Sequence, residues 1–216
     1  MKKSYLTTAF QKTAKNYPAQ TETLNVAFDA RLSQLRRENA DASAEKQRHL
    51  ESQILPGIAA YETLQMVMPK EQALQTVHGY VEQRAWRLKK IFVRLLHIPG
   101  LYRKVPAIFA EQTPKLFGPA AGFAATEIQT TGGVWRIDMT KCPYHDACVQ
   151  YGCPELCHCF CDSDDITYDG MHLQWSPAAP GPSPAAADPG RPGSGGSPAE
   201  SPPHRHGYRC RKWCII

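Results

Sequence analysis

Residues 124–139 read AATEIQTTGGVWRIDM, and the hydrophobic pattern of the chain changes period within them. Ala124, Thr126 and Ile128 alternate with Glu127 and Gln129, and Trp135, Ile137 and Met139 alternate with Arg136 and Asp138, with Thr-Thr-Gly-Gly between the two runs. Strict alternation is typical of a half-buried strand, and a short Gly-containing connection is typical of a hairpin. These residues therefore predict two antiparallel strands.

The residues before the hairpin follow helical spacing instead. Leu50, Ile54, Ile58, Tyr61 and Leu64 recur every three or four positions, and we expect Pro56 in the first turn of a new helix. A further helix is expected from Pro69 to about His97. Its apolar stripe is Leu74, Val77, Val81, Leu88, Ile91 and Leu95, and its opposite, solvated side is expected to carry Arg84, Arg87, Lys89 and Lys90.

After the hairpin, two short helices are expected, one from Pro143 to Gln150 and one from Pro154 to about Asp164. His172 to Trp175 predict a third strand. The fold class predicted is α+β, with a helical N-terminal half followed by a small antiparallel sheet that carries a Cys-rich helical segment.

The C-terminal residues have a different composition from the rest of the chain. The chain has 216 residues and 18 prolines, nine of which lie between Pro177 and Pro203. A segment so rich in Pro, Ala, Ser and Gly has too little apolar surface to fold. We therefore expect one α+β domain over residues 1–175 and a disordered tail over residues 176–216.

Charge and hydropathy exclude several classes of partner. The formal net charge is +5, and residues 176–216 contribute +3 of it, so residues 1–175 carry only +2. A nearly balanced domain gives no reason to expect nucleic acid as a partner. The most apolar stretch, from Ile91 to Tyr102, is shorter than the ~20 residues of a membrane span. We expect a cytoplasmic protein with reduced thiols, a small-molecule substrate and no membrane partner; its oligomeric state stays open.

Six of the eight cysteines fall between Cys142 and Cys161. Successive cysteines differ by 6, 5, 4, 2 and 2 in residue number, so no two of them form the Cys-x-x-Cys pair that is typical of a zinc knuckle. His145 and His158 add two imidazoles as possible ligands. One interpretation is a zinc-binding or redox-sensing module without catalysis. Another is plain burial, which is favoured for Cys148, Cys153 and Cys159.

Two cysteines stand where chemistry is favoured. Cys142 directly follows the second strand, and active-site residues favour strand ends and the loops after them. Cys161 precedes Asp164 by three positions, so the thiol and the carboxyl group share one face of a helix. Because a carboxylate disfavours a neighbouring thiolate, the pair suits proton transfer or substrate orientation.

Four segments together resemble a known family. They are ILPGIAAY at 54–61, DMTKCPY at 138–144, GCPEL at 152–156 and FCDSD at 160–164. In this order they resemble the L-2-amino-thiazoline-4-carboxylic acid hydrolase family, over roughly residues 50–175. The resemblance implies hydrolytic opening of a 2-amino-thiazoline ring that carries a carboxylate, which yields N-carbamoyl-L-cysteine on a bacterial route to cysteine.

The resemblance also suggests roles for particular residues. Cys142, Cys161 and Asp164 match the family's pattern. We expect Cys142 as nucleophile or proton donor, Asp164 to orient water or the amidinium, and Cys161 to support them. Two cations near the hairpin, Arg136 and Lys141, are candidates for binding the substrate carboxylate, and His145 is a reserve base. Neither a metal nor another cofactor is expected.

The resemblance ends after Trp175. The codons that can encode residues 179–189, read in a frame shifted by two nucleotides, can encode Thr-Arg-Thr-Leu-Ala-Arg-Gly-Gly-Gly-Pro. This segment is similar to the one that follows the last aspartate segment in family members. We hypothesise a frameshift in the gene. A chain altered in this way is expected to lack the last family strand and to be inactive or poorly folded. Resequencing of the locus tests the frameshift.

Overall fold

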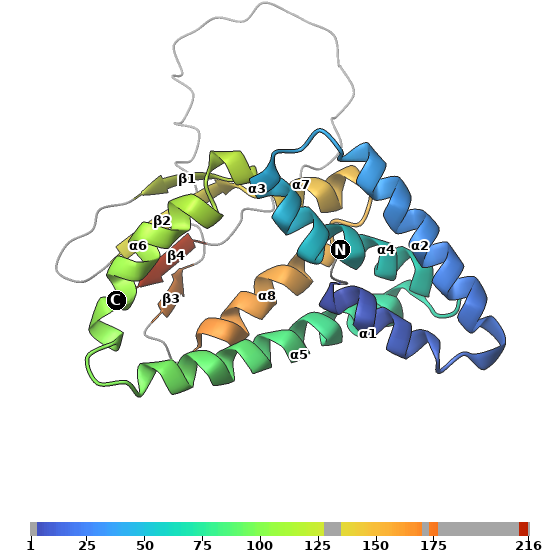
Figure 1. The fold of residues 1–216 in the computed structure, drawn as a ribbon, viewed down its shortest axis with the longest axis horizontal. Coiled ribbons are helices and arrows are strands. Elements are labelled where there is room, and N and C mark those ends of the chain that lie inside the picture. The colour runs from blue at the N-terminus through green and yellow to red at the C-terminus, as the bar shows by residue number, and fades with distance from the viewer. Residues whose placement is uncertain (1–3, 128–134, 170–172, 177–211, 216) are drawn as a thin grey trace, which may run out of the picture.

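The structure is a computed structural model that describes residues 4–127, 135–169, 173–176 and 212–215. Helices dominate the first two-thirds of the chain (Figure 1). They are α1 (Tyr5–Ala14), α2 (Thr21–Glu38), α3 (Ala44–His49), α4 (Leu55–Leu64), α5 (Lys70–Leu96) and α6 (Val105–Leu116). Single 3₁₀ turns lie at Pro18–Gln20, Tyr102–Lys104 and Pro119–Ala121. Two more helices follow the hairpin, namely α7 (Pro143–Gln150) and α8 (Leu156–Tyr168).

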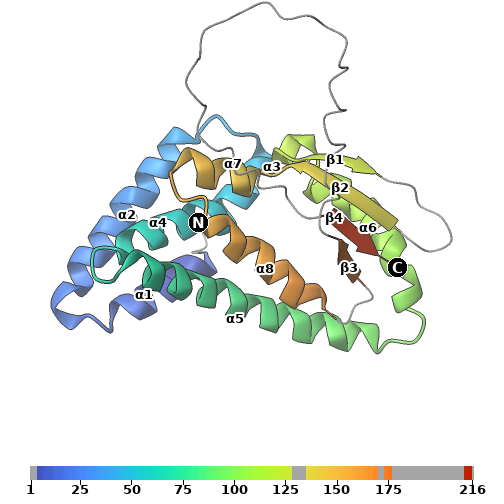
Figure 2. The same ribbon diagram turned by 180° about the vertical axis from the view of Figure 1, so that it is seen from behind.

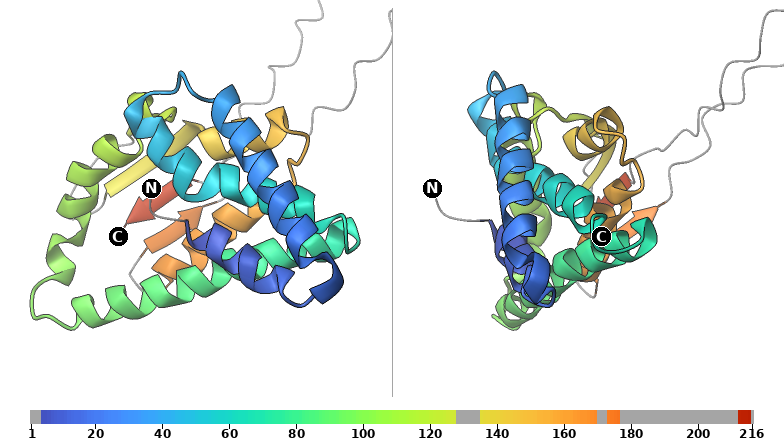
Figure 3. Two further views of the ribbon diagram at one scale, coloured as in Figure 1. Left: turned by 45° about the vertical axis from the view of Figure 1, so that its right-hand side comes forward. Right: turned by 90° about the vertical axis from the view of Figure 1, so that its right-hand side faces the viewer.

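Helices α5 and α6 form two sides of the molecule, and α8 and the sheet lie between them (Figures 1 and 2). Helix α8 packs along α5, and α4 packs against α1, α2 and α5. Helices α1 and α2 lie side by side on one flank (Figure 3). This arrangement surrounds α4 with other elements, which explains why every residue from Leu55 to Tyr61 is buried.

The join between α3 and α4 is a π-helical turn, Leu50–Ile54. The expected helix start is confirmed, because Pro56 stands in the first turn of α4. Proline has no N–H and crowds the carbonyl four residues before it. The chain passes this point through a wider helical turn, with no intervening loop. Such turns occur frequently at functional sites.

The sheet confirms the predicted hairpin and the third strand. Its strands are β1 (Ala124–Glu127), β2 (Trp135–Lys141), β3 (Leu173–Ser176) and β4 (Lys212–Ile215), in the order β1-β2-β4-β3. All neighbouring pairs are antiparallel, with Thr126 opposite Asp138 and Trp175 opposite Trp213. The Thr-Thr-Gly-Gly turn lies outside the described residues.

The tail differs from expectation at its two described ends. Ser176 is the last residue of β3, and Lys212–Ile215 pairs with both β2 and β3, so these residues belong to the sheet. The expectation that the whole of 176–216 lies apart from the fold is therefore wrong for these five residues. Alternating Trp213 and Ile215 supply the strand pattern that the Pro-rich composition hid. Residues 177–211, which include the site of the frameshift hypothesis, lie outside the described residues.

Gly57 allows α4 and α8 to approach closely. A Cβ atom at this position would lie 2.9 Å from Cζ of Phe160 and 3.6 Å from Cδ1 of Leu6. Phe160 is buried and its ring meets that of Tyr144 edge-on at 5.2 Å, so it has little room to move. The glycine of the ILPGIAAY motif is thus explained by helix packing.

We predict that Gly57→Ala is less stable than the matched variant Gly79→Ala by about 1–3 kcal/mol. Both changes replace a helical glycine and share the gain in helix propensity. A Cβ at Gly79 meets nothing within 4 Å, whereas one at Gly57 forces Phe160 to shift. Urea unfolding of the two variants measures the difference, and equal free energies of unfolding would contradict the close-packing account.

Candidate active site

A cavity of about 360 Å³ lies where α5, α8 and the π-helical turn meet the start of α7. Its volume suits a small organic molecule. Three of the residues predicted from the sequence line it, namely Cys142, Cys161 and Asp164. Cys142 directly precedes α7, and Cys161 and Asp164 lie on α8, which follows it. The packing of α7 against α8 places the three side chains around the same cavity.

Cys161 and Asp164 both lie on α8 and both face the cavity. This agrees with their expected common helix face. Cys142 is the residue between β2 and α7, where it holds an extended backbone and its side chain makes no capping hydrogen bond. Its side chain is half-buried and lines the cavity.

Asp164 is the most perturbed carboxyl group of the site. Burial raises the pKa of Asp164 well above its ordinary value, and the neighbouring Cys161, Asp165 and Cys142 raise this pKa further. Among the described residues, no Lys, Arg or His lies within ion-pair distance of its oxygens. The site therefore favours the neutral carboxylic acid, which is a proton donor.

A chain of hydrogen bonds forms another wall of the cavity. The Tyr5 hydroxyl donates to Oε1 of Gln53 at 3.4 Å, and Nε2 of Gln53 donates to the Tyr144 hydroxyl at 3.3 Å. The Tyr144 oxygen lies 3.2 Å from Nδ1 of His49, and Nε2 of His49 lies 2.8 Å from the carbonyl oxygen of Leu116. Since a carbonyl only accepts, His49 carries its proton on Nε2 and accepts from Tyr144 at Nδ1.

Burial holds this chain in its neutral forms. Burial has the largest effect on the pKa of His49 and lowers it. The hydrogen bond to the Leu116 carbonyl raises this pKa by less, and the nearby Arg48 lowers it further by the smallest amount. Burial raises the pKa of Tyr144, so its phenol keeps its proton. Sequence spacing gives no sign that these residues meet, since Tyr144 and Gln53 are 91 positions apart.

Arg84 also lines the cavity, contrary to the expectation that it lies on the solvated side of its helix. It is half-buried, and its guanidinium carbon lies 4.4 Å from the centre of the Tyr5 ring. A signal was present, because Arg84 follows Val81 by three positions and precedes Leu88 by four, which puts it on the apolar face.

Two of the other predicted residues, Lys141 and His145, lie elsewhere. Lys141 is exposed and its Nζ lies 3.9 Å from Oδ2 of Asp146. His145 also faces Asp146, at 3.7 Å from Nδ1 to Oδ1. Neither residue lines the cavity. The side chain of Arg136 lies outside the described residues.

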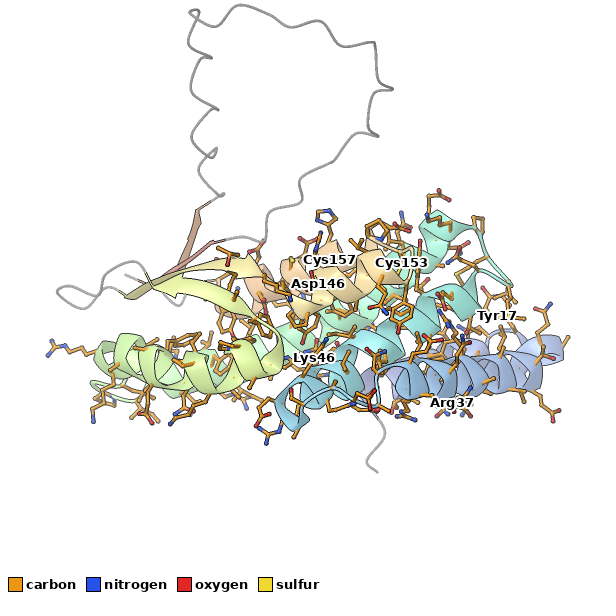
Figure 4. All side chains as sticks on the ribbon, turned by 90° about the horizontal axis from the view of Figure 1, so that it is seen from above. Tyr17, Arg37, Lys46, Asp146, Cys153 and Cys157 are labelled. Atoms are coloured by element: carbon orange, nitrogen blue, oxygen red, sulfur yellow. The ribbon has the colours of Figure 1, made fainter. Side chains whose placement is uncertain are left out.

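The cysteines not facing the cavity are buried thiols. Cys148, Cys153, Cys157 and Cys159 are free and buried, which confirms that expectation for Cys148, Cys153 and Cys159. The Cys148 thiol contacts both Cys153 and Cys157, and Figure 4 shows the last two at the packed ends of α7 and α8. In the described part of the chain, no three His, Cys, Asp or Glu side chains are grouped as metal ligands. The zinc alternative therefore finds no ligand set there.

A family model for L-2-amino-thiazoline-4-carboxylic acid hydrolase matches residues 47–176, which is more than half of the chain. The chain belongs to this family. Neither the curated proteins nor the solved structures include a significant match.

The L-2-amino-thiazoline-4-carboxylic acid hydrolase match covers most of the cavity. It begins within α3 and ends with β3, and it includes Arg84, Cys142, Cys161 and Asp164. Membership in the family indicates a hydrolase-type function on a small molecule. None of the helices among the described residues combines the length and apolar character that a membrane crossing requires.

Proposed function

We propose that the chain hydrolyses L-2-amino-thiazoline-4-carboxylate to N-carbamoyl-L-cysteine. The observation that carries this proposal is the cavity itself: within the residues matched by the hydrolase family, an acid with a raised pKa and two thiols line one small space. The reaction needs protons at two atoms of the ring, and these groups supply them.

The first step is activation of the amidine. The neutral Asp164 carboxyl donates its proton to the ring nitrogen, and the resulting amidinium makes the carbon between nitrogen and sulfur more electrophilic. The proton transfer also gives Asp164 the cationic partner that the described residues do not provide. An amidinium and a carboxylate match in two parallel hydrogen bonds, so this pairing orients the ring as well.

The second step is addition of water and departure of sulfur. Water attacks the activated carbon and gives one proton to the Asp164 carboxylate. The carbon–sulfur bond then breaks, the Cys142 thiol protonates the leaving sulfur, and the tetrahedral carbon becomes the carbamoyl carbonyl. The remaining proton of the water returns to Cys142, so both residues end in their starting forms.

Cys161 acts as a positioning residue in this scheme. It contributes to the raised pKa of Asp164, and its thiol contacts Cys157 on the same helix. A thiol at this place brings no positive charge to Asp164. The acid therefore remains protonated until the substrate arrives.

The test is a turnover assay on L-2-amino-thiazoline-4-carboxylate with N-carbamoyl-L-cysteine quantified by mass spectrometry. Two proteins are compared, the chain as it stands and a version with the shifted reading frame restored. We expect the version with the restored reading frame to form product in proportion to enzyme concentration, and the chain as it stands to form less product or none, because it lacks the last family strand. Absence of product from both proteins, with folding verified by circular dichroism, would contradict the proposed function.

A further inference from the structure

The strongest unassigned feature of the cavity is the cation Arg84. Arg84 makes a cation–π contact with Tyr5, but within the described residues no carboxylate lies within 4 Å of its guanidinium. The other half-buried arginines, Arg31 and Arg36, are each paired with a glutamate, Glu62 and Glu51 respectively. A guanidinium that lines a cavity and has no carboxylate within ion-pair distance is a ready site for an anionic ligand.

The platform beneath Arg84 is fixed by the hydrogen-bonded wall. Tyr5 is held by Gln53, Gln53 is held by Tyr144, and Tyr144 is held by His49. A side chain that is already ordered loses little entropy when it binds, so a planar guanidinium on a fixed ring recognises a planar carboxylate well.

Two other cations line the cavity, and both are less suitable. Lys115 is exposed and already bonded to Glu111 at 2.8 Å. Arg48 is exposed, so water screens its charge. Arg84 alone among these three combines partial burial with an ordered contact to an aromatic ring.

We propose that Arg84, seated on the Tyr5 ring, binds the carboxylate of the ligand while Asp164 binds its amidine. The cavity is then a receptor for a small molecule that carries an anion at one end and a basic amidine at the other. This inference rests on the proposed function for its choice of ligand. It replaces Arg136 and Lys141 as the carboxylate-binding residue and makes Arg84 the residue that determines specificity for acids.

Binding is measured with two aromatic probes that resist hydrolysis, 2-aminothiazole-4-carboxylate and 2-aminothiazole, which lacks the carboxylate. Titration calorimetry on the full chain compares the wild type with Arg84→Gln, Arg84→Lys, Arg48→Gln and Arg87→Gln. Arg87 is the matched control, because it lies on the same helix, is exposed and does not line the cavity. Circular dichroism verifies the fold of each variant.

We expect Arg84→Gln to raise the dissociation constant of the carboxylate probe at least about tenfold, because the charge-assisted pair is lost. The dissociation constant of 2-aminothiazole is expected to change by no more than about twofold. The affinity of Arg84→Lys for the carboxylate probe is expected to lie between those of the wild type and Arg84→Gln. Arg48→Gln and Arg87→Gln are expected to bind this probe as tightly as the wild type. If Arg84→Gln does not fold, the Arg84→Lys comparison gives the result.

Three results would overturn the proposal: equal carboxylate affinity in the wild type and the Arg84 variants, equal losses for both probes, or a wild type that binds neither probe. The binding readout is independent of turnover. If carboxylate binding depends on Arg84 but the protein shows no turnover, the result supports this inference and counts against the proposed function. If the protein shows turnover that does not depend on Arg84, the result supports the proposed function and counts against this inference.

Discussion

Replacement of Asp164 by asparagine is expected to lower kcat for ring opening by about 10²–10⁴-fold. Asparagine has the same shape and still forms hydrogen bonds, but it cannot transfer a proton to the ring nitrogen. Steady-state kinetics with L-2-amino-thiazoline-4-carboxylate measure the loss. The matched control is Asp162→Asn on the same helix, because Asp162 lies outside the cavity and faces His78 at 3.4 Å.

Equal kcat values for Asp164→Asn and the wild type would refute the acid role. A second readout of the same variant does not depend on turnover. Since the pKa of Asp164 is raised in the folded protein, the stability that this group contributes is full below its ordinary pKa and is lost as the pH rises through the folded pKa. Asparagine has no such dependence.

Thermal unfolding between pH 4 and pH 8 therefore compares the two proteins. We expect the unfolding temperature of Asp164→Asn, relative to that of the wild type, to increase as the pH rises. A difference of 1 kcal/mol corresponds to roughly 2–4 °C in a domain of this size, which is measurable. A difference that stays constant with pH would show that the carboxyl group is not held neutral.

Replacement of Cys142 by alanine is expected to lower kcat by a similar factor, about 10²–10⁴, because the leaving sulfur then departs without a proton donor. Cys142→Ser keeps a weaker donor and is expected to retain part of the activity. The control is Cys159→Ala, since Cys159 is buried away from the cavity and burial raises the pKa of its thiol to about 12. That variant is expected to lose stability and keep kcat.

A second experiment distinguishes a proton-donor role of Cys142 from a nucleophilic role. Intact-protein mass spectrometry of the wild type during turnover is expected to show no covalent adduct. An adduct on Cys142, absent in Cys142→Ser, would contradict the donor role and assign the attack on the ring to the thiol.

Local pattern was sufficient for the elements and for part of the site. The change of hydrophobic period within residues 124–139 predicted the hairpin, and the three-residue spacing predicted that Cys161 and Asp164 share a face of α8. Each of these inferences concerns neighbours in the chain, where side-chain direction follows from backbone geometry.

Arg84, Tyr5 and His49 show where local pattern failed. A cation on an amphipathic helix is usually solvated, and nothing near Arg84 in the chain indicates that Tyr5, 79 positions earlier, covers it. His49 acquires its role through Tyr144, which is 95 positions away. The cations nearest to Cys142 in sequence were the natural candidates, yet Lys141 turns to Asp146 at the surface.

The amino-acid sequence alone predicted the α+β fold, the resemblance to the family, and the thiol and carboxyl groups to which the proposal gives chemical roles. These depend on periodicity and on motifs, which are properties of consecutive residues. The tertiary structure alone determined which cation and which hydrogen-bonded wall face those groups, and that a strand from the end of the chain joins the sheet. The reason is physical: helix packing brings α1, α3, α5 and α8 around one space, and burial there sets the protonation of Asp164 and His49.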